Sequence, residues 1–163
     1  QLVNSVPWSD DFNSIVALEP SKIFARNSHV LVGLARGDAK YVQGIHSSPL
    51  GMGTIARVGD VDFYVNGPSA TVPGAQNVIE AACRPVRYFA ETVIPGNEND
   101  FPARAVSSLK QYENNAAYAK RAYMGINTQT NVKGDYILEV NEEAPFGRRS
   151  EAHRIPLVKT QRA

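Results

Sequence analysis

The chain has a single cysteine, and the residues around it have types that could do chemistry. Cys83 is followed by Arg84, Arg87 and Tyr88 in one predicted helix. A thiol beside cationic groups shifts towards the thiolate, which can attach a cofactor covalently. Guanidinium groups then pair with anionic substituents in bidentate geometry. The alternative is a small buried side chain, the default for a free cysteine, and the sequence leaves both interpretations open.

Other reactive residue types lack partners at the required spacing. His29, His46 and His153 are far apart, so folding would have to assemble any zinc site, and structural histidines are the default. Residues 51–56 have the form G-x-G-x-x-A, but a predicted strand follows where a dinucleotide loop needs a helix. No G-x-S-x-G, P-loop or H-E-x-x-H motif occurs. We therefore expect no enzymatic activity, with a small enzyme dependent on Cys83 as the alternative.

Two stretches have the alternation typical of strands. Residues 54–65 predict a β-hairpin that turns at Gly59 and Asp60, with apolar residues alternating in its second arm. Residues 134–141 predict one strand with a single apolar face. Asp60 and Asp62 are expected on the solvated surface of the hairpin rather than in acid–base chemistry.

Two longer stretches have helical periodicity. Residues 75–92 carry apolar residues on one stripe and predict a helix that Pro85 divides or kinks. Residues 100–124 predict a second helix, because small and aromatic residues recur at steps of three and four. Short helices are also expected within residues 9–27, and residues 44–53 predict a loop.

Length and composition limit the chain to one modest core. It has 163 residues, of which 43% are hydrophobic and 20% charged, as in ordinary globular proteins. We predict a small, irregular α+β domain with one β-hairpin, two to four helices and extended ends. Residues 54–143 form its expected core, residues 1–53 an irregular arm with short helices, and residues 144–163 a basic extended arm that a partner orders.

Charge narrows the possible partners. Seventeen basic and sixteen acidic residues give a net charge of +1, which excludes a nucleic-acid binder that relies on bulk positive charge. No apolar run approaches the roughly 18 residues of a membrane span. The first residue is Gln1, so we expect either a removed targeting segment or an internal start. Contacts with acidic partner proteins are assigned to five arginines. They are Arg104, Arg121, Arg148, Arg149 and Arg154.

The predicted helix around Cys83 resembles the bilin-attachment helix of phycobiliproteins, in which a cysteine follows two small residues and an arginine lies just beyond. Here Ala81 and Ala82 precede Cys83, but Arg84-Pro85 replaces the Arg-Asp pair of that family. The all-helical pattern of phycobiliprotein subunits is also absent. The wider chain is similar to the linker polypeptides of phycobilisomes, above all the γ-type linkers of red-algal phycoerythrin. This similarity covers residues 78–125 and the basic arm.

The resemblance implies a non-enzymatic linker that organises pigment proteins for light harvesting, peripheral on the stromal face of the chloroplast thylakoid. It implies phycobiliproteins as partners. It also implies a bilin attached to Cys83, with Arg84, Arg87 and Tyr88 as its nearest supports. The alternatives within the structural class are an accessory subunit of another large complex and a minor capsid protein.

Overall fold

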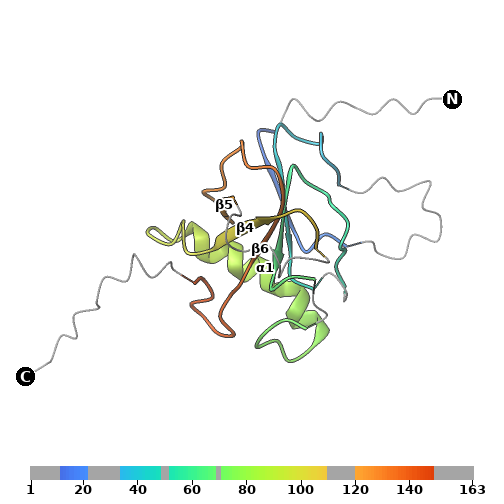
Figure 1. Ribbon diagram of the computed structural model, residues 1–163. Helices are drawn as coiled ribbons and strands as arrows, with labels where there is room; N and C mark the ends of the chain where they lie inside the picture. Colours follow the sequence, from blue (N-terminus) through green and yellow to red (C-terminus); the bar gives the residue numbers. More distant parts are fainter. Residues whose placement is uncertain (1–11, 22–33, 49–51, 69–70, 110–119, 149–163) are drawn as a thin grey trace, which may run out of the picture.

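A six-stranded mixed sheet is the frame of the structure (Figure 1). The computed structural model describes residues 12–21, 34–48, 52–68, 71–109 and 120–148. The strands are β1 (Ile15–Leu18), β2 (Val42–His46), β3 (Val61–Val65), β4 (Pro102–Val106), β5 (Arg121–Tyr123) and β6 (Gly134–Leu138). Their order in the sheet is β1-β2-β3-β6-β4-β5, and helix α1 (Val78–Val93) lies between β3 and β4 in the chain.

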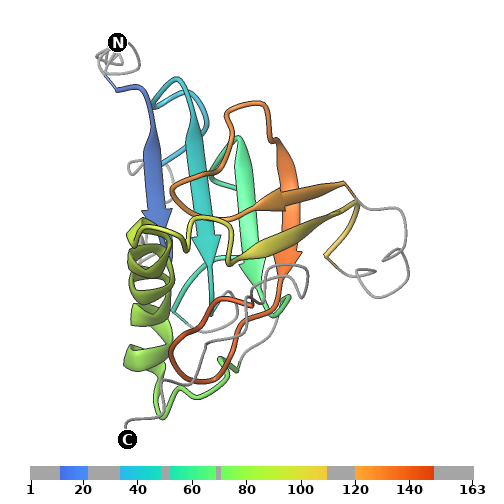
Figure 2. The same cartoon turned by 90° about the vertical axis from the view of Figure 1, so that its left-hand side faces the viewer.

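Four of these strands, β1, β2, β3 and β6, are parallel. Figure 2 shows their arrows side by side, with the arrows of β4 and β5 running across them. In the sheet, β4 pairs antiparallel with β6, and β5 pairs antiparallel with β4. Parallel sheets are normally covered on both faces. Both β2 and β3 are buried along their whole length. Alternation along these strands therefore does not separate a buried face from a solvated one.

One face of the sheet packs into an aromatic core. The rings of Phe63 on β3 and Tyr136 on β6 lie 5.6 Å apart. Tyr88 of α1 completes this core, because its ring lies 6.1 Å from that of Phe101 and 5.2 Å from that of Phe146, the latter edge-on. Offset and edge-on arrangements are those that aromatic pairs prefer.

Helix α1 turns two charged residues towards the interior. The Arg84 guanidinium donates to the carbonyl oxygen of Glu142 at 3.1 Å and lies 5.0 Å from the centre of the Phe146 ring. The Glu91 carboxylate accepts the backbone N–H groups of Phe146 and Gly147, both at 2.8 Å. The segment after β6 is therefore held on the helix by two buried charges.

The apolar stripe predicted to face the core is largely exposed instead. Four of its side chains are more than half exposed: Val78, Ile79, Val86 and Val93. The buried residues of α1 include Arg84 and Glu91, whose partners lie about fifty residues further along the chain. The inward face of α1 therefore combines hydrogen bonds to that segment with the packing of Tyr88 in the aromatic core, and not the predicted apolar stripe.

Two predicted elements are confirmed. The helix predicted for residues 75–92 is α1, and the Asn77 side chain caps it by accepting the N–H of Glu80 at 2.9 Å. Pro85 lies inside this single helix and does not divide it into two. The strand predicted within residues 134–141 is β6.

The predicted hairpin and the second predicted helix are wrong. In residues 54–65 only β3 forms, and its neighbours are the parallel strands β2 and β6. Within residues 100–124 the structure has β4 and β5, because pairing with β6 overrides the helical spacing. Residues 110–119 of that stretch lie outside the described part.

The sheet also extends into the predicted N-terminal arm. Strand β1 replaces a predicted short helix, and β2 occupies part of the loop predicted for residues 44–53, because each strand has a parallel partner. The sheet thus crosses the predicted boundary at residue 54. The division into arm, core and arm stays a prediction, as does the α+β class. Residues 22–33 and 149–163 lie outside the described part.

Gly125 makes one of the closest backbone approaches in the fold. Its φ is +117°, and a Cβ there would lie 2.4 to 2.6 Å from atoms of the Thr92 side chain. The Gln43 side chain accepts its N–H at 3.1 Å and donates to its carbonyl oxygen at 3.3 Å. Gly37 has a similar φ of +98° with nothing within 4 Å of a Cβ.

We predict that Gly125→Ala destabilises the protein more than Gly37→Ala does. Both substitutions impose left-handed backbone strain of about 1–3 kcal/mol. Only Gly125→Ala adds a clash, which costs about 1–3 kcal/mol more. Urea denaturation of the two variants gives this difference in the free energy of unfolding, and equal losses would contradict the prediction.

Candidate functional site

The candidate site lies at the carboxyl ends of the parallel strands, where ligands bind in open sheets of this kind. Glu19 directly follows β1, and Ser47 and Ser48 directly follow β2. Strands β1 and β2 are parallel neighbours, so these residues share one edge of the sheet. No spacing of residues in the sequence marks this group, and it was not predicted. The one signal that could have revealed it is the acidic residue directly after the apolar run of residues 15–18, which was interpreted as a short helix.

Glu19 is held by donors from the neighbouring strand end. Its Oε2 accepts the N–H of Ser47 at 2.9 Å and lies 2.5 Å from the Ser47 Oγ, while the N–H of Ser48 lies 3.1 Å from both carboxylate oxygens. The Ser47 Oγ is also 2.8 Å from the carbonyl oxygen of Ala81 on α1. Glu19 itself adopts a left-handed φ of +54°, which is uncommon for a non-glycine residue.

The predicted G-x-G-x-x-A stretch packs on this carboxylate. A Cβ at Gly53 would lie 1.9 Å from the Glu19 Oε1, so the close approach requires glycine. The N–H of Gly53 donates to the Ser48 carbonyl at 3.1 Å, and that of Thr54 donates to the Pro20 carbonyl at 2.9 Å. The described part of this loop therefore covers an acidic side chain, as expected for a structural loop.

A second acidic group lies on the face of the sheet that points away from the aromatic core. His46 and Asp62 are buried, with 0% and 1% of their side chains exposed, and their Nε2 and Oδ1 atoms are 2.8 Å apart. The His46 Nδ1 lies 2.8 Å from the carbonyl oxygen of Thr54. Both of these partners are oxygen atoms, so both ring nitrogens are engaged in hydrogen bonds within the protein. Asp62 also accepts the N–H groups of Val58 and Gly59, both at 3.1 Å.

The surroundings of this pair leave no room for a substrate. The Tyr64 ring stacks on the His46 ring with 4.5 Å between their centres. A Cβ at Gly44 would lie 2.4 Å from the Asp62 Oδ1. The Tyr64 hydroxyl donates to the Ile55 carbonyl at 2.9 Å, and burial, reinforced by the charge of Asp62, raises the pKa of Tyr64. His46 is thus a structural histidine.

The expectation that Asp62 lies on a solvated surface is wrong. It was based on a hairpin with one solvated face, whereas β3 is a central parallel strand. The loop of residues 52–60, which we call the strap, covers the face that carries Asp62. Arg57 of the strap also donates to both carboxylate oxygens of Asp135 on β6, at 2.6 and 2.7 Å.

The structure does not bring the four residues predicted to hold a cofactor into one site. Cys83 and Arg87 are exposed, whereas Arg84 and Tyr88 are buried. Neighbouring positions on a helix point in different directions, so the exposed pair Cys83 and Arg87 is separated from the buried pair Arg84 and Tyr88. Arg84 already holds the segment after β6. Burial raises the pKa of Tyr88 to about 12, although the charge of Arg84 lowers it.

Three of the five arginines predicted to contact partners lie together. Arg104, Arg121 and Arg148 line one groove over β4, β5 and β6. Arg149 and Arg154 lie outside the described residues. Whether any of them contacts a partner protein stays a prediction.

Among the described residues, no group of three or more His, Cys, Asp or Glu side chains is placed to hold a metal ion. Within the same ranges, no helix has the length and apolar character needed to cross a membrane.

An open, mostly parallel sheet with polar residues at the carboxyl ends of its strands is the arrangement of many α/β enzymes and binding proteins. Comparison with known proteins identifies the family. Residues 8–146 match the family model described as Lipase, and the chain belongs to the lipase family.

The similar proteins carry two kinds of name. The chain is 61% identical over 140 residues to Vitellogenin-1 of Ceratitis capitata and 54% identical over 140 residues to Vitellogenin-3 of Drosophila melanogaster. Each alignment covers 86% of the chain and 32% or 33% of the relative. The chain is also 34% identical over 85 residues to Phospholipase A1 1 of Dolichovespula maculata, and this alignment covers 50% of the chain and 26% of that protein. The chain thus spans about a third of the length of its vitellogenin relatives.

These findings overturn the phycobilisome resemblance. A chain of the lipase family with vitellogenin relatives in flies is not a phycobilisome linker, and the light-harvesting function and the chloroplast location are wrong with it. The resemblance covered two predicted helices, and β4 and β5 replace the second. Nothing in the structure tests a bilin on Cys83, and the family that suggested one does not apply.

We predict that His46→Ala lowers the free energy of unfolding by about 3–5 kcal/mol, because it leaves the buried Asp62 side chain without its His46 partner. The matched control is Arg36→Ala. Arg36 pairs with Asp60 at 3.5 Å, but its side chain is 66% exposed, so its loss should change stability by no more than about 1 kcal/mol. Urea denaturation compares the two. Similar losses in both variants would show that the His46–Asp62 pair is not a major constraint.

Proposed function

We propose that this chain is part of a vitellogenin-like, non-catalytic protein of the lipase family that serves as egg yolk material. The observation that carries the proposal is the engagement of His46. Among the described residues, His46 is the one histidine. Its side chain is fully buried, and both of its ring nitrogens form hydrogen bonds within the protein. A general base must reach the proton it removes, and His46 reaches only Asp62 and Thr54.

The order of catalytic residues in this class supports the proposal. α/β-Hydrolases place the histidine after the acidic residue in the chain. After Glu19 the sequence has three histidines, of which His29 lies outside the described residues and His153 lies beyond the residues that match the family. Helix α1, which contacts the Glu19 group through Ala81, contains no histidine.

The hydrogen bonds of Glu19 point the same way. In a catalytic triad the carboxylate orients the imidazole of the histidine. The Glu19 carboxylate accepts from Ser47 and Ser48 instead. Glu19 lies where a catalytic acid would lie, directly after a parallel strand, but its hydrogen bonds are those of a structural residue.

The names of the relatives favour storage over hydrolysis. Vitellogenin denotes a precursor of egg yolk, and the two vitellogenin relatives above match the chain over more residues and at higher identity than Phospholipase A1 1 does. Phospholipid hydrolysis is the second candidate, because that relative is named as a phospholipase.

We predict that the full-length protein hydrolyses neither phosphatidylcholine in mixed micelles nor p-nitrophenyl butyrate. Loss of the histidine of a triad lowers kcat by about 10⁶-fold, so any turnover should lie about 10⁶-fold below that of an active lipase. A wasp phospholipase A1 is the positive control. Turnover that Glu19→Gln abolishes would contradict the proposal and favour the second candidate.

A further inference from the structure

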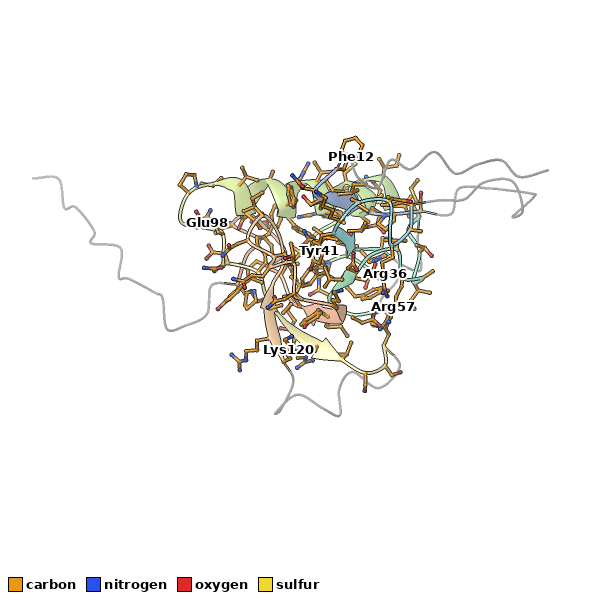
Figure 3. The ribbon with its side chains drawn as sticks, turned by 90° about the horizontal axis from the view of Figure 1, so that it is seen from above. Phe12, Arg36, Tyr41, Arg57, Glu98 and Lys120 are labelled. Carbon is orange, nitrogen blue, oxygen red and sulfur yellow. The ribbon has the colours of Figure 1, made fainter. Side chains whose placement is uncertain are left out.

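A groove over the antiparallel part of the sheet gathers three arginines. It encloses about 330 Å³, within the range of small-molecule sites. Its apolar lining consists of Pro102, Ala103, Ile137 and Leu138, and its charged lining of Arg104, Arg121, Arg148 and Glu139. Lys120, directly before β5, lies on the side of the molecule opposite α1 (Figure 3). The groove is at the β4–β5 edge of the sheet, and the Glu19 group is at the opposite edge, after β1 and β2.

Two of these arginines are placed against each other. Arg104 on β4 and Arg121 on β5 are direct partners in the antiparallel register. Side chains at such positions have Cβ atoms about 5 Å apart, and like charges directly opposite destabilise the sheet. Neither guanidinium forms an ion pair with another residue of the described ranges. The fold thus tolerates a repulsion that a bound anion would relieve.

The net charge of the groove indicates the charge of the anion that it can bind. Arg148 forms an ion pair with Glu139, whose carboxylate offsets one of the three positive charges. The remaining charge is +2. A phosphate monoester carries about −1.5 to −2 at neutral pH, so its charge matches that of the groove.

We propose that this groove binds the phosphate group of a small phosphorylated molecule or of a lipid headgroup. The guanidinium forks of Arg104 and Arg121 hold the phosphate oxygens, since arginine pairs with phosphate through two parallel N–H···O bonds. Arg148 adds a third cation at the rim. The organic part of the ligand lies on the apolar lining. This site is independent of the proposed absence of hydrolysis.

The test is a titration of the full-length protein with inorganic phosphate at a constant ionic strength set with chloride. Calorimetry and thermal unfolding measure the binding. We expect saturable binding and a rise in Tm. Arg104→Gln and Arg121→Gln should each weaken binding at least about tenfold, because each removes charge-assisted hydrogen bonds. Arg87→Gln, an exposed arginine of α1, is the matched control and should leave the affinity unchanged.

A second readout separates ligand binding from a structural role. Without phosphate, Arg104→Gln and Arg121→Gln should keep or raise the Tm, because each removes the cross-strand repulsion. Vesicles of phosphatidylcholine with and without phosphatidic acid then distinguish the sources of the phosphate. Binding of phosphatidic acid vesicles identifies a headgroup site, and binding of inorganic phosphate alone identifies a site for a soluble ligand.

Three results would overturn the proposal. One is a phosphate effect that does not saturate or that chloride reproduces. Another is equal weakening of binding by Arg87→Gln. The third is a lower Tm of both groove variants without phosphate together with unchanged phosphate affinity, which would make the two arginines structural.

Discussion

The buried pair of His46 and Asp62 is the constraint on which the parallel sheet depends. Burying polar side chains such as these costs free energy unless hydrogen bonds satisfy them, and the pair is tolerated because further hydrogen bonds satisfy both groups. Those bonds come from Thr54, Val58 and Gly59 of the strap. The pair therefore holds the strap over one face of the sheet, while α1 and the aromatic core cover the other face. A parallel sheet needs both.

The same use of charge recurs across the fold and supports the proposed non-catalytic role. Glu19 binds the strand end at Ser47 and Ser48, and Glu91 with Arg84 binds the segment after β6. Polar groups that could face a substrate are thus bonded to backbone. The arginines of the groove differ, because two of them face each other and have no carboxylate partner among the described residues. Ligand binding is therefore proposed there and not at the strand ends.

Local signals in the sequence predicted α1 and β6, because the Asn77 cap and the alternation after residue 134 act within a few residues. Signals that depend on distant partners were not visible. The sequence of β2 contains glycine and histidine and was interpreted as part of a loop. It forms a strand because it pairs with β1 and β3. The inward face of α1 is set by Glu142 and Phe146, more than fifty residues from the helix side chains that bind them. Arg104 and Arg121 were predicted as binding residues on a helix, but antiparallel pairing places them together.

Nuclear magnetic resonance of the protein labelled with ¹⁵N in its histidine rings tests most directly whether His46 is structural. The buried, hydrogen-bonded pair predicts that the ring N–H protons of His46 exchange slowly with water. Ring protons that exchange as fast as those of free imidazole would contradict the account. Such a result would make His46 accessible as a base and favour phospholipid hydrolysis, the second candidate.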